Sequence, residues 1–349
     1  MFLKTYKLGA YLLASVFLIV SLIIGISVGS IQVPVSAIIG SIFNELFSAS
    51  FAVDPMYESI VLSIRLPRVL LAGLIGASLA IAGAAFQGLL KNPLADPYTL
   101  GVSSGASLGA VIVLYLGLSI PGLHSFTLPV LSICFAFLTI LLVLLFARLA
   151  SKSMSVATII LTGIIFNSFI GAFISLLIAL SGDELRQIIG WLLGSVSMRG
   201  WEYIQLILPF FFIGSLILIF NSHELNVLSF GEEKAKHLGV HVQRRKLWIL
   251  LAASMLTGSA VAVSGTIGFV GLVIPHLARL LWGTNHKHLL PLSMIIGAGF
   301  LIVADLVSRT IISPSELPIG VITSIIGAPV FAMLLLRGRL EGRGSYVKD

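Results

Sequence analysis

The stretch from residue 97 to residue 147 reads PYTLGVSSGASLGAVIVLYLGLSIPGLHSFTLPVLSICFAFLTILLVLLFA and contains no Asp, Glu, Lys or Arg in 51 residues. A helix that crosses the hydrocarbon core of a membrane needs about 20 apolar residues, so this run is long enough for two crossings. Pro121, Gly122 and Pro129 interrupt it. Because these residues favour turns, the run predicts two antiparallel helices joined near residues 118–127.

Uncharged runs of this kind make up most of the chain. Of its 349 residues, 58% are hydrophobic and 10% are charged, which leaves too little polar surface for a soluble protein. The other runs are residues 8–44, 69–90, 153–182, 203–222, 247–275, 289–304 and 317–336. We expect one crossing from each, except that 247–275 is long and carries Gly265, Gly268 and Gly271, where a shorter or broken helix could turn back. The count is nine or ten.

Charge placement decides between these counts. Cytoplasmic loops of membrane proteins carry an excess of Lys and Arg, and both ends of this chain are basic, with Lys4 and Lys7 at one and Arg337, Arg339, Arg343 and Lys348 at the other. Both termini are therefore predicted to be cytoplasmic, which requires an even number of crossings. Ten crossings place 16 of the 21 Lys and Arg inside, among them Lys152. This topology accounts for the basic excess without a nucleic acid partner.

We therefore predict an all-α, polytopic membrane protein with ten transmembrane helices in a single transmembrane domain over residues 1–349. A first-half bundle covers about 1–202, a cytoplasmic segment covers 223–246 and a second-half bundle covers 247–337. A Gly-rich span that ends in a Pro-bearing turn occurs near 73–97 and again near 265–291, a weak inverted repeat of the kind found in transporters. No G-x-x-x-x-G-K-[ST] phosphate loop is present, so we expect that the chain does not hydrolyse ATP itself and would need a soluble partner for any energy from a nucleotide.

Enzyme and metal motifs are weak. The segment Gly101-Val102-Ser103-Ser104-Gly105 matches the G-x-S-x-G pattern of serine hydrolases, but a helix start rich in small residues that pack closely is the better explanation. The pair His237 and His241 has Gly239 between its members, which we expect to end the helix that would align them. We predict no catalytic residue, no metal site and no cofactor.

Two polar segments remain candidates for function. Residues 230–239, FGEEKAKHLG, place Glu232 and Lys236 at the i, i+4 spacing that favours an ion pair, with Gly239 as a C-terminal cap. They predict a short cytoplasmic helix, either a solvated connector or a lever for a partner. On the outside, Arg65, Arg68 and Arg309 lie at the ends of spans, where they either anchor the interface or bind carboxylates of an external partner.

Several motifs taken together resemble one family. They are 65-RLPR-68, 83-GAAFQGLLKNPLADP-97, 100-LGVSSGA-106, 191-WLLGS-195, 238-LG-239, 268-GFVGLVIPHLAR-279, Asp305 with Arg309, 316-ELPIG-320 and 327-GAPVF-331. In this order and spacing the chain resembles the FecCD-type permeases of binding-protein-dependent ABC importers, which carry iron-siderophore complexes, haem or cobalamin. The resemblance covers about residues 60–337.

The resemblance implies roles for particular residues. In such permeases the short cytoplasmic helix docks on a cytoplasmic dimer of ABC ATPases, which assigns coupling to Gly231, Glu232, Ala235, Leu238 and Gly239. The outer arginines Arg65, Arg68 and Arg309 would receive glutamates of an extracytoplasmic substrate-binding protein. A translocation gate would lie at Ser155, Val156 and Ala157. The permease would pair with a second copy or with a related permease in the cell membrane.

The cargo and one rival mechanism stay open at this point. Iron(III)-siderophore complexes are the first expectation, with haem or cobalamin as the alternative within the same family. An ion-coupled secondary transporter is the alternative from another class, and it needs ionisable groups inside the bilayer. Asp305 is the one acid that could lie near the membrane interior, and Arg309 is its expected partner.

Overall fold

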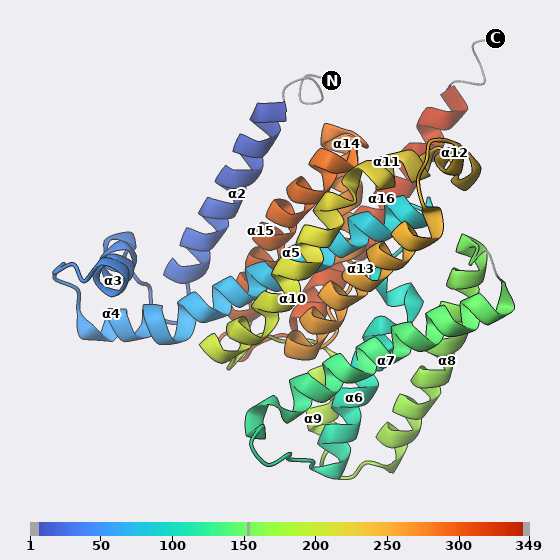
Figure 1. Ribbon diagram of the computed structural model, residues 1–349. Helices are drawn as coiled ribbons and strands as arrows, with labels where there is room; N and C mark the ends of the chain where they lie inside the picture. The colour runs from blue at the N-terminus through green and yellow to red at the C-terminus, as the bar shows by residue number, and fades with distance from the viewer. Residues whose placement is uncertain (1–6, 152–153, 345–349) are drawn as a thin grey trace.

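The computed structural model describes residues 7–151 and 154–344, and the described chain is helical throughout (Figure 1). The longer helices, in chain order, are α2 (Lys7–Ser27), α3 (Val35–Phe47), α5 (Leu66–Leu90), α6 (Val102–Leu116), α7 (Thr127–Ala150), α8 (Val156–Leu180), α10 (Trp201–Phe220), α13 (Val242–Ser264), α14 (Val270–Trp282), α15 (His286–Thr310) and α16 (Ile319–Gly344). Short helices connect them: α4 (Pro55–Ser59), η1 (Ile60–Arg65), η2 (Pro97–Leu100), η3 (His124–Phe126), α9 (Leu185–Leu192), α11 (Ser222–Ser229) and α12 (Glu232–His237). The predicted all-α class is confirmed.

Within residues 7–151 and 154–344, seven helical segments are long and apolar enough to cross a membrane. Four shorter apolar helices accompany them, Val35–Phe47, Val102–Leu116, Val270–Trp282 and Ile319–Met333. The predicted hairpin over residues 97–147 is present as α6 and α7, with its turn between Leu116 and Thr127. The total of ten crossings and the inverted repeat stay predictions, as does the division of the chain into two half-bundles.

The first uncharged run differs from its prediction. Residues 8–44 were expected to form one crossing, but α2 ends at Ser27 and a separate helix, α3, begins at Val35. Pro34 precedes α3 and fits the start of a helix, where its missing N–H costs nothing. The carbonyl groups at the end of α2 are held by a remote side chain, described below, so the chain turns at this point.

The core of the protein is formed by α5 and α13. Helix α5 is the last part of the continuous helical segment Pro55–Leu90. Of the most apolar stretch in each segment, 89% of the residues are buried in Pro55–Leu90 and 78% in α13, but only 11% in α8. In Figure 1, α5 and α13 run through the middle of the bundle, whereas α7 and α8 lie at its edge. The outward surface of α8 is thus left for lipid or for another protein chain.

The broken helix predicted in the run 247–275 is confirmed. Helix α13 ends at Ser264, and α14 begins at Val270 after a five-residue break. Gly265 starts the break with a φ of +72°, and a Cβ atom there would overlap the carbonyl oxygen of Trp191. Both conditions exclude side chains, so glycine is required at this position.

The break is held by one tyrosine, which leads to a first prediction. The Tyr98 hydroxyl donates to the carbonyl oxygen of Ile267 (2.7 Å) and accepts from the N–H of Ile267 (2.9 Å). Tyr98→Phe leaves both backbone groups without this partner, which should cost about 1–3 kcal/mol of stability. Thermal unfolding of the purified protein in detergent measures this loss.

Tyr11→Phe serves as the control for that change. The Tyr11 hydroxyl contacts Nδ1 of His288 at 3.3 Å on the edge of the bundle, so its loss should change the unfolding temperature by much less. Equal effects of the two substitutions would contradict the role given to Tyr98.

Both ends of the described chain and the short helix α12 lie at the same end of the bundle. Figure 1 shows the start of α2, the end of α16 and α12 there, with α3 and α4 toward the opposite end. This arrangement fits an even number of crossings. Three of the basic residues predicted to be cytoplasmic, Lys4, Lys152 and Lys348, lie outside the described residues.

Candidate functional site

Arg65 holds the end of helix α2. Its guanidinium donates to the carbonyl oxygens of Ile26 (2.7 Å) and Ser27 (2.8 Å) and also to that of Ile31. The last carbonyl groups of a helix have no partner within the helix and carry partial negative charge, so a cation stabilises them. Arg65 is buried in this position. It therefore connects the start of α5 with the turn between α2 and α3.

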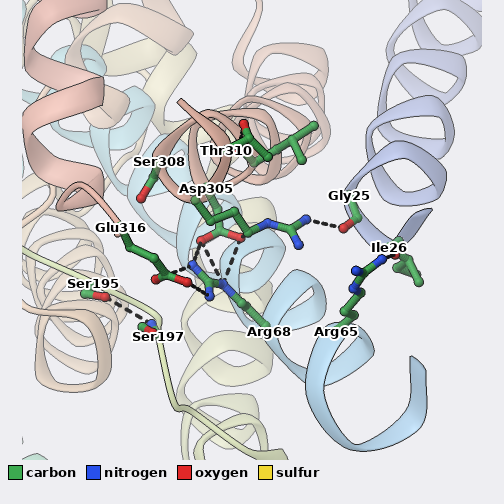
Figure 2. A network of polar contacts seen from close by, with 12 residues as sticks. Gly25, Ile26, Arg65, Arg68, Ser195, Ser197, Asp305, Ser308, Thr310 and Glu316 are labelled. Atoms are coloured by element: carbon green, nitrogen blue, oxygen red, sulfur yellow. Dashed lines mark hydrogen bonds and ion pairs between the residues drawn. The ribbon is translucent and has the colours of Figure 1, made fainter. Parts of the chain in front are cut away.

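Arg68 lies between two carboxylates from the far end of the sequence. Its Nε and Nη2 atoms donate to Asp305 at 2.8–3.1 Å, and its Nη1 and Nη2 atoms donate to Glu316 at 2.8 and 3.0 Å. Figure 2 shows the guanidinium between these two acids. Asp305 is 1% exposed, whereas the Glu316 side chain is 35% exposed. One partner of Arg68 is thus buried and the other can be reached from outside.

Arg309 completes the cluster. Its Nε atom lies 3.6 Å from Asp305, and its Nη2 atom donates to the carbonyl oxygen of Gly25 in α2. The expected pairing of Asp305 with Arg309 is confirmed, although Arg68 lies closer to the carboxylate. We call Arg65, Arg68, Asp305, Arg309 and Glu316 the outer cluster.

The outer cluster sets a condition for the predicted docking of an external partner. All three arginines are largely buried and bound within the chain, with 11% of the Arg68 side chain and 8% of the Arg309 side chain exposed. A partner carboxylate can reach Arg68 only by replacing Glu316. The hydrogen bond from Arg68 holds the pKa of Glu316 below its usual value, so this residue stays ionised and competes at neutral pH. Docking at these arginines remains a prediction.

The predicted short helix of residues 230–239 forms as α12. Gly231 precedes it with a φ of +118°, and Gly239 follows it with a φ of +82°. At its end the N–H of Gly239 bonds the carbonyl of Lys236 and the N–H of Val240 bonds that of Ala235, which is the Schellman pattern of a glycine-capped helix. The predicted cap at Gly239 is confirmed. Both ends of α12 therefore need glycine.

One ion pair in this segment differs from its prediction. Glu232 was expected to pair with Lys236, but its Oε1 atom lies 2.6 Å from the Nζ atom of Lys246 in α13. An exposed i, i+4 pair contributes only a few tenths of a kcal/mol, so pairing with the buried ammonium of Lys246, which has no other carboxylate partner among the described residues, is favoured over it. Glu232 thus fixes α12 to α13.

The surface of α12 carries apolar side chains toward water. Phe230 is 70% exposed and Leu238 is 68% exposed, while Ala235 is fully buried against the rest of the protein. Large apolar residues that flank a helix at the aqueous end of a membrane protein are unfavourable unless a partner covers them.

The three residues predicted as a gate lie at the start of α8. Ser155 caps this helix, because its Oγ atom accepts a hydrogen bond from the N–H of Thr158 at 3.2 Å. Val156 is the first residue of the helix, and Ala157 is exposed. Their function as a gate is not tested by this geometry and stays a prediction.

A cavity of about 550 Å³ lies where the break after α13 meets α6, α8, α9 and α16. Its polar lining consists of hydroxyl groups, from Tyr98, Ser103, Ser104, Ser107, Thr266 and Ser324. The rest of the lining is glycine and aliphatic side chains. Ser103 therefore belongs to a cavity wall. The G-x-S-x-G segment serves helix packing, since a Cβ atom on Gly105 would lie 2.8 Å from the carbonyl oxygen of Phe135 in α7.

Sequence reasoning missed three residues that organise these sites. Glu316 stood in a recognised motif without a role, Tyr98 lay in an apolar run, and Lys246 followed two arginines in a basic stretch. Each acts through a partner more than 80 residues away. The signal that could have found Glu316 is its charge in an otherwise apolar outer segment.

A bundle of apolar helices with one broken span, a cavity lined by uncharged residues and a short capped helix at one end defines a membrane transport subunit of the permease class. Residues 17–337 match the model of the FecCD transport family, and the chain belongs to this family. It is an ABC importer permease and a multi-pass membrane protein.

Relatives with known sequences agree with this assignment. The chain is 63% identical over 342 residues to the uncharacterized ABC transporter permease protein YvrB of Bacillus subtilis (strain 168), covering 98% of this chain and 97% of the relative. It is 41% identical over 299 residues to the hemin transport system permease protein HmuU of Yersinia pestis, covering 83% and 87%. A solved transporter assigned to the metal-chelate type of ABC transporters, in an inward-facing conformation, superposes with a TM-score of 0.82 at 34% identity, covering 95% and 100%.

Proposed function

We propose that this chain carries iron(III)-siderophore complexes across the cell membrane, driven by a separate ATPase. The observation that carries this proposal is the neutral lining of the 550 Å³ cavity. A bare metal ion or a small oxyanion would need ligands or countercharges along its path. A lining of hydroxyl and aliphatic groups suits a bulky complex in which the chelator already coordinates the metal ion. Such a complex is recognised at a site outside this cavity.

The ATPase partner is proposed to bind at α12. Phe230 and Leu238 offer an exposed apolar pair at the end of the bundle where both termini lie. Gly231, Glu232, Ala235, Leu238 and Gly239 form or cap the helix that would enter a groove of a cytoplasmic ABC ATPase dimer. The capped geometry supports this proposal, because a short helix must be rigid to transmit force.

An external substrate-binding protein is proposed to dock over the outer cluster. Its carboxylates would exchange with Glu316 on Arg68, close to Arg65 and Arg309. The exposure of Glu316 and the burial of Asp305 support exchange at Glu316, since only this outer acid can leave Arg68 without exposing a buried charge pair.

A second permease subunit is proposed to cover the outward face of α8. Its low burial supports this proposal, and the partner is either a second copy of this chain or a related permease. The cargo would then pass between the two subunits, past the start of α8 at Ser155, Val156 and Ala157.

Uptake by cells that lack this chain tests the cargo. Cells are supplied in parallel with labelled ferric siderophores of the hydroxamate and catecholate types, haem, cobalamin and molybdate. We expect the deletion to abolish uptake of one ferric siderophore, because the uncharged lining of the cavity suits a metal complex. The intact gene should restore this uptake. Selective loss of haem or cobalamin uptake would move the proposal to the alternative cargo, and loss of molybdate uptake would contradict it.

A further inference from the structure

Lys246 is a deeply buried cation at the α12 end of the molecule. It lies one turn into α13, directly after the exposed Arg244 and the partly exposed Arg245, yet its side chain is 1% exposed. Burying an ammonium is costly unless strong acceptors surround it. Two acceptors are present, Oε1 of Glu232 at 2.6 Å and the carbonyl oxygen of Met154 at 3.0 Å.

These acceptors come from segments far apart in the sequence. Glu232 is the first residue of α12. Met154 immediately precedes Ser155, the cap of α8. Met154 adopts a φ of +45°, which is unusual for a side chain of its kind, and its N–H bonds the carbonyl of Ser151 at 2.9 Å. The ammonium of Lys246 thus joins α12, the core helix α13 and the turn that starts α8.

Two of the helices that Lys246 joins differ in how deeply they are buried. Helix α13 is packed in the core, whereas α8 is the least buried of the long helices. Glu232 is 29% exposed on the surface that faces a partner. If α12 moved without Lys246, the ammonium would keep only one acceptor inside the protein, and such a state is strongly disfavoured. Movement of α12 is therefore expected to displace the start of α8.

We propose that Lys246 is a positioning residue that transmits displacement of α12 to the Met154–Ser155 turn at the start of α8. This inference rests on the proposed function, since it takes α12 as the helix that the ATPase moves. A link of this kind biases the start of α8 only if the ATPase holds α12 differently in its two nucleotide states. The link gives a reason for a lysine at a buried position where an aliphatic residue would cost less free energy to bury.

The test measures two distances within one chain by pulsed electron paramagnetic resonance. The native Cys134 is first replaced by Ser, and labelled chains are diluted with unlabelled ones. Lys236→Cys reports α12 and Ala157→Cys reports the start of α8, each paired with a label at Lys287→Cys on α15 as a fixed reference. The permease is purified with its ATPase, and each distance is recorded with and without a non-hydrolysable ATP analogue.

We expect nucleotide to shift both distances in the otherwise unchanged protein. Lys246→Met keeps an unbranched side chain only one atom shorter and removes its charge, so the α12 shift should persist while the shift at Ala157 falls to less than about half. Arg245→Met is the matched control. Arg245 pairs with Glu224 and Asn221 and does not contact Met154 in the contacts described, so both shifts should persist.

The outcomes separate the two proposals. If nucleotide leaves α12 in place in the unchanged protein, both the coupling role of α12 and the inference on Lys246 are overturned. If nucleotide shifts each of the two distances by the same amount in Lys246→Met as in the unchanged protein, only the inference on Lys246 is overturned.

A second measurement removes the ambiguity of a damaged fold. Glu232→Met strands the ammonium and should lower the unfolding temperature more than the double change Glu232→Met with Lys246→Met, which removes both charges. The double variant should thus regain stability but not the shift at Ala157. Recovery of both would mean that the pair serves stability only, and the proposal would be wrong.

Discussion

Gly83→Leu is expected to abolish folded protein, and Gly83→Ala should already be severe. A Cβ atom on Gly83 in α5 would overlap the carbonyl oxygen of Gly271 in α14 and would lie 2.6 Å from the Cα atom of Gly271. The obstacle is backbone, which cannot move aside as a flexible side chain can. Overpacking of a core usually costs about 1–3 kcal/mol, and a clash between two helix backbones should exceed that range. The yield of monodisperse protein on size-exclusion chromatography and its unfolding temperature measure the effect.

Gly171→Ala provides the control. Gly171 lies within α8, and no atom outside its own helix neighbourhood lies within 4 Å of a Cβ atom placed there. Alanine favours a helix over glycine by about 1 kcal/mol, so this variant should be as stable as the parent or more stable. Normal yield and unfolding temperature for Gly83→Ala would show that α5 and α14 do not approach as closely as described.

Local signals in the sequence predicted local features well. The turn of the hairpin between α6 and α7, the break after Ser264 and the cap of α12 each depend on Pro or Gly residues whose effect reaches only a few positions. These elements could be located without knowing which other helices they contact.

Remote contacts could not be predicted in the same way. The division of residues 8–44 into α2 and α3 depends on Arg65, whose guanidinium holds carbonyl groups nearly 40 positions earlier. The hydropathy of the sequence does not distinguish one long span from a span that is followed by a surface helix. The error in this run therefore follows from a side chain outside it.

Lys246 shows the same limit for a functional residue. Arg244, Arg245 and Lys246 are equivalent as cytoplasmic charges under the positive-inside rule, and the sequence alone does not tell which of them turns inward. Helix periodicity separates positions 244 and 246 by about 200°. Choosing the buried one requires knowing which face of α13 meets the Met154 turn and α12.

Asp305→Ala is expected to destabilise the protein by about 3–5 kcal/mol, because it removes the buried carboxylate shared by two largely buried guanidiniums. Arg68 would keep Glu316 at the surface, and Arg309 would keep the carbonyl of Gly25. Thermal unfolding in detergent, without cargo or ATP, measures the loss. Glu316→Ala is the matched control: it removes the exposed carboxylate from the same guanidinium, and exposed pairs contribute only about 0–1 kcal/mol.

The double variant Asp305→Ala with Arg68→Met decides what the carboxylate does. If its role is to neutralise buried arginines, removing one of them should recover part of the stability, and the two changes should be clearly non-additive. An ion-coupled transporter predicts another pattern: Asp305→Asn would leave stability unchanged and abolish uptake at any ATP level, because the acid would carry the coupling proton. With Arg68 at 2.8 Å and Arg309 at 3.6 Å, a charged partner lies on each side of Asp305. Protonating it would remove the buried countercharge that Arg68 and Arg309 share, so this geometry favours the ATP-driven mechanism.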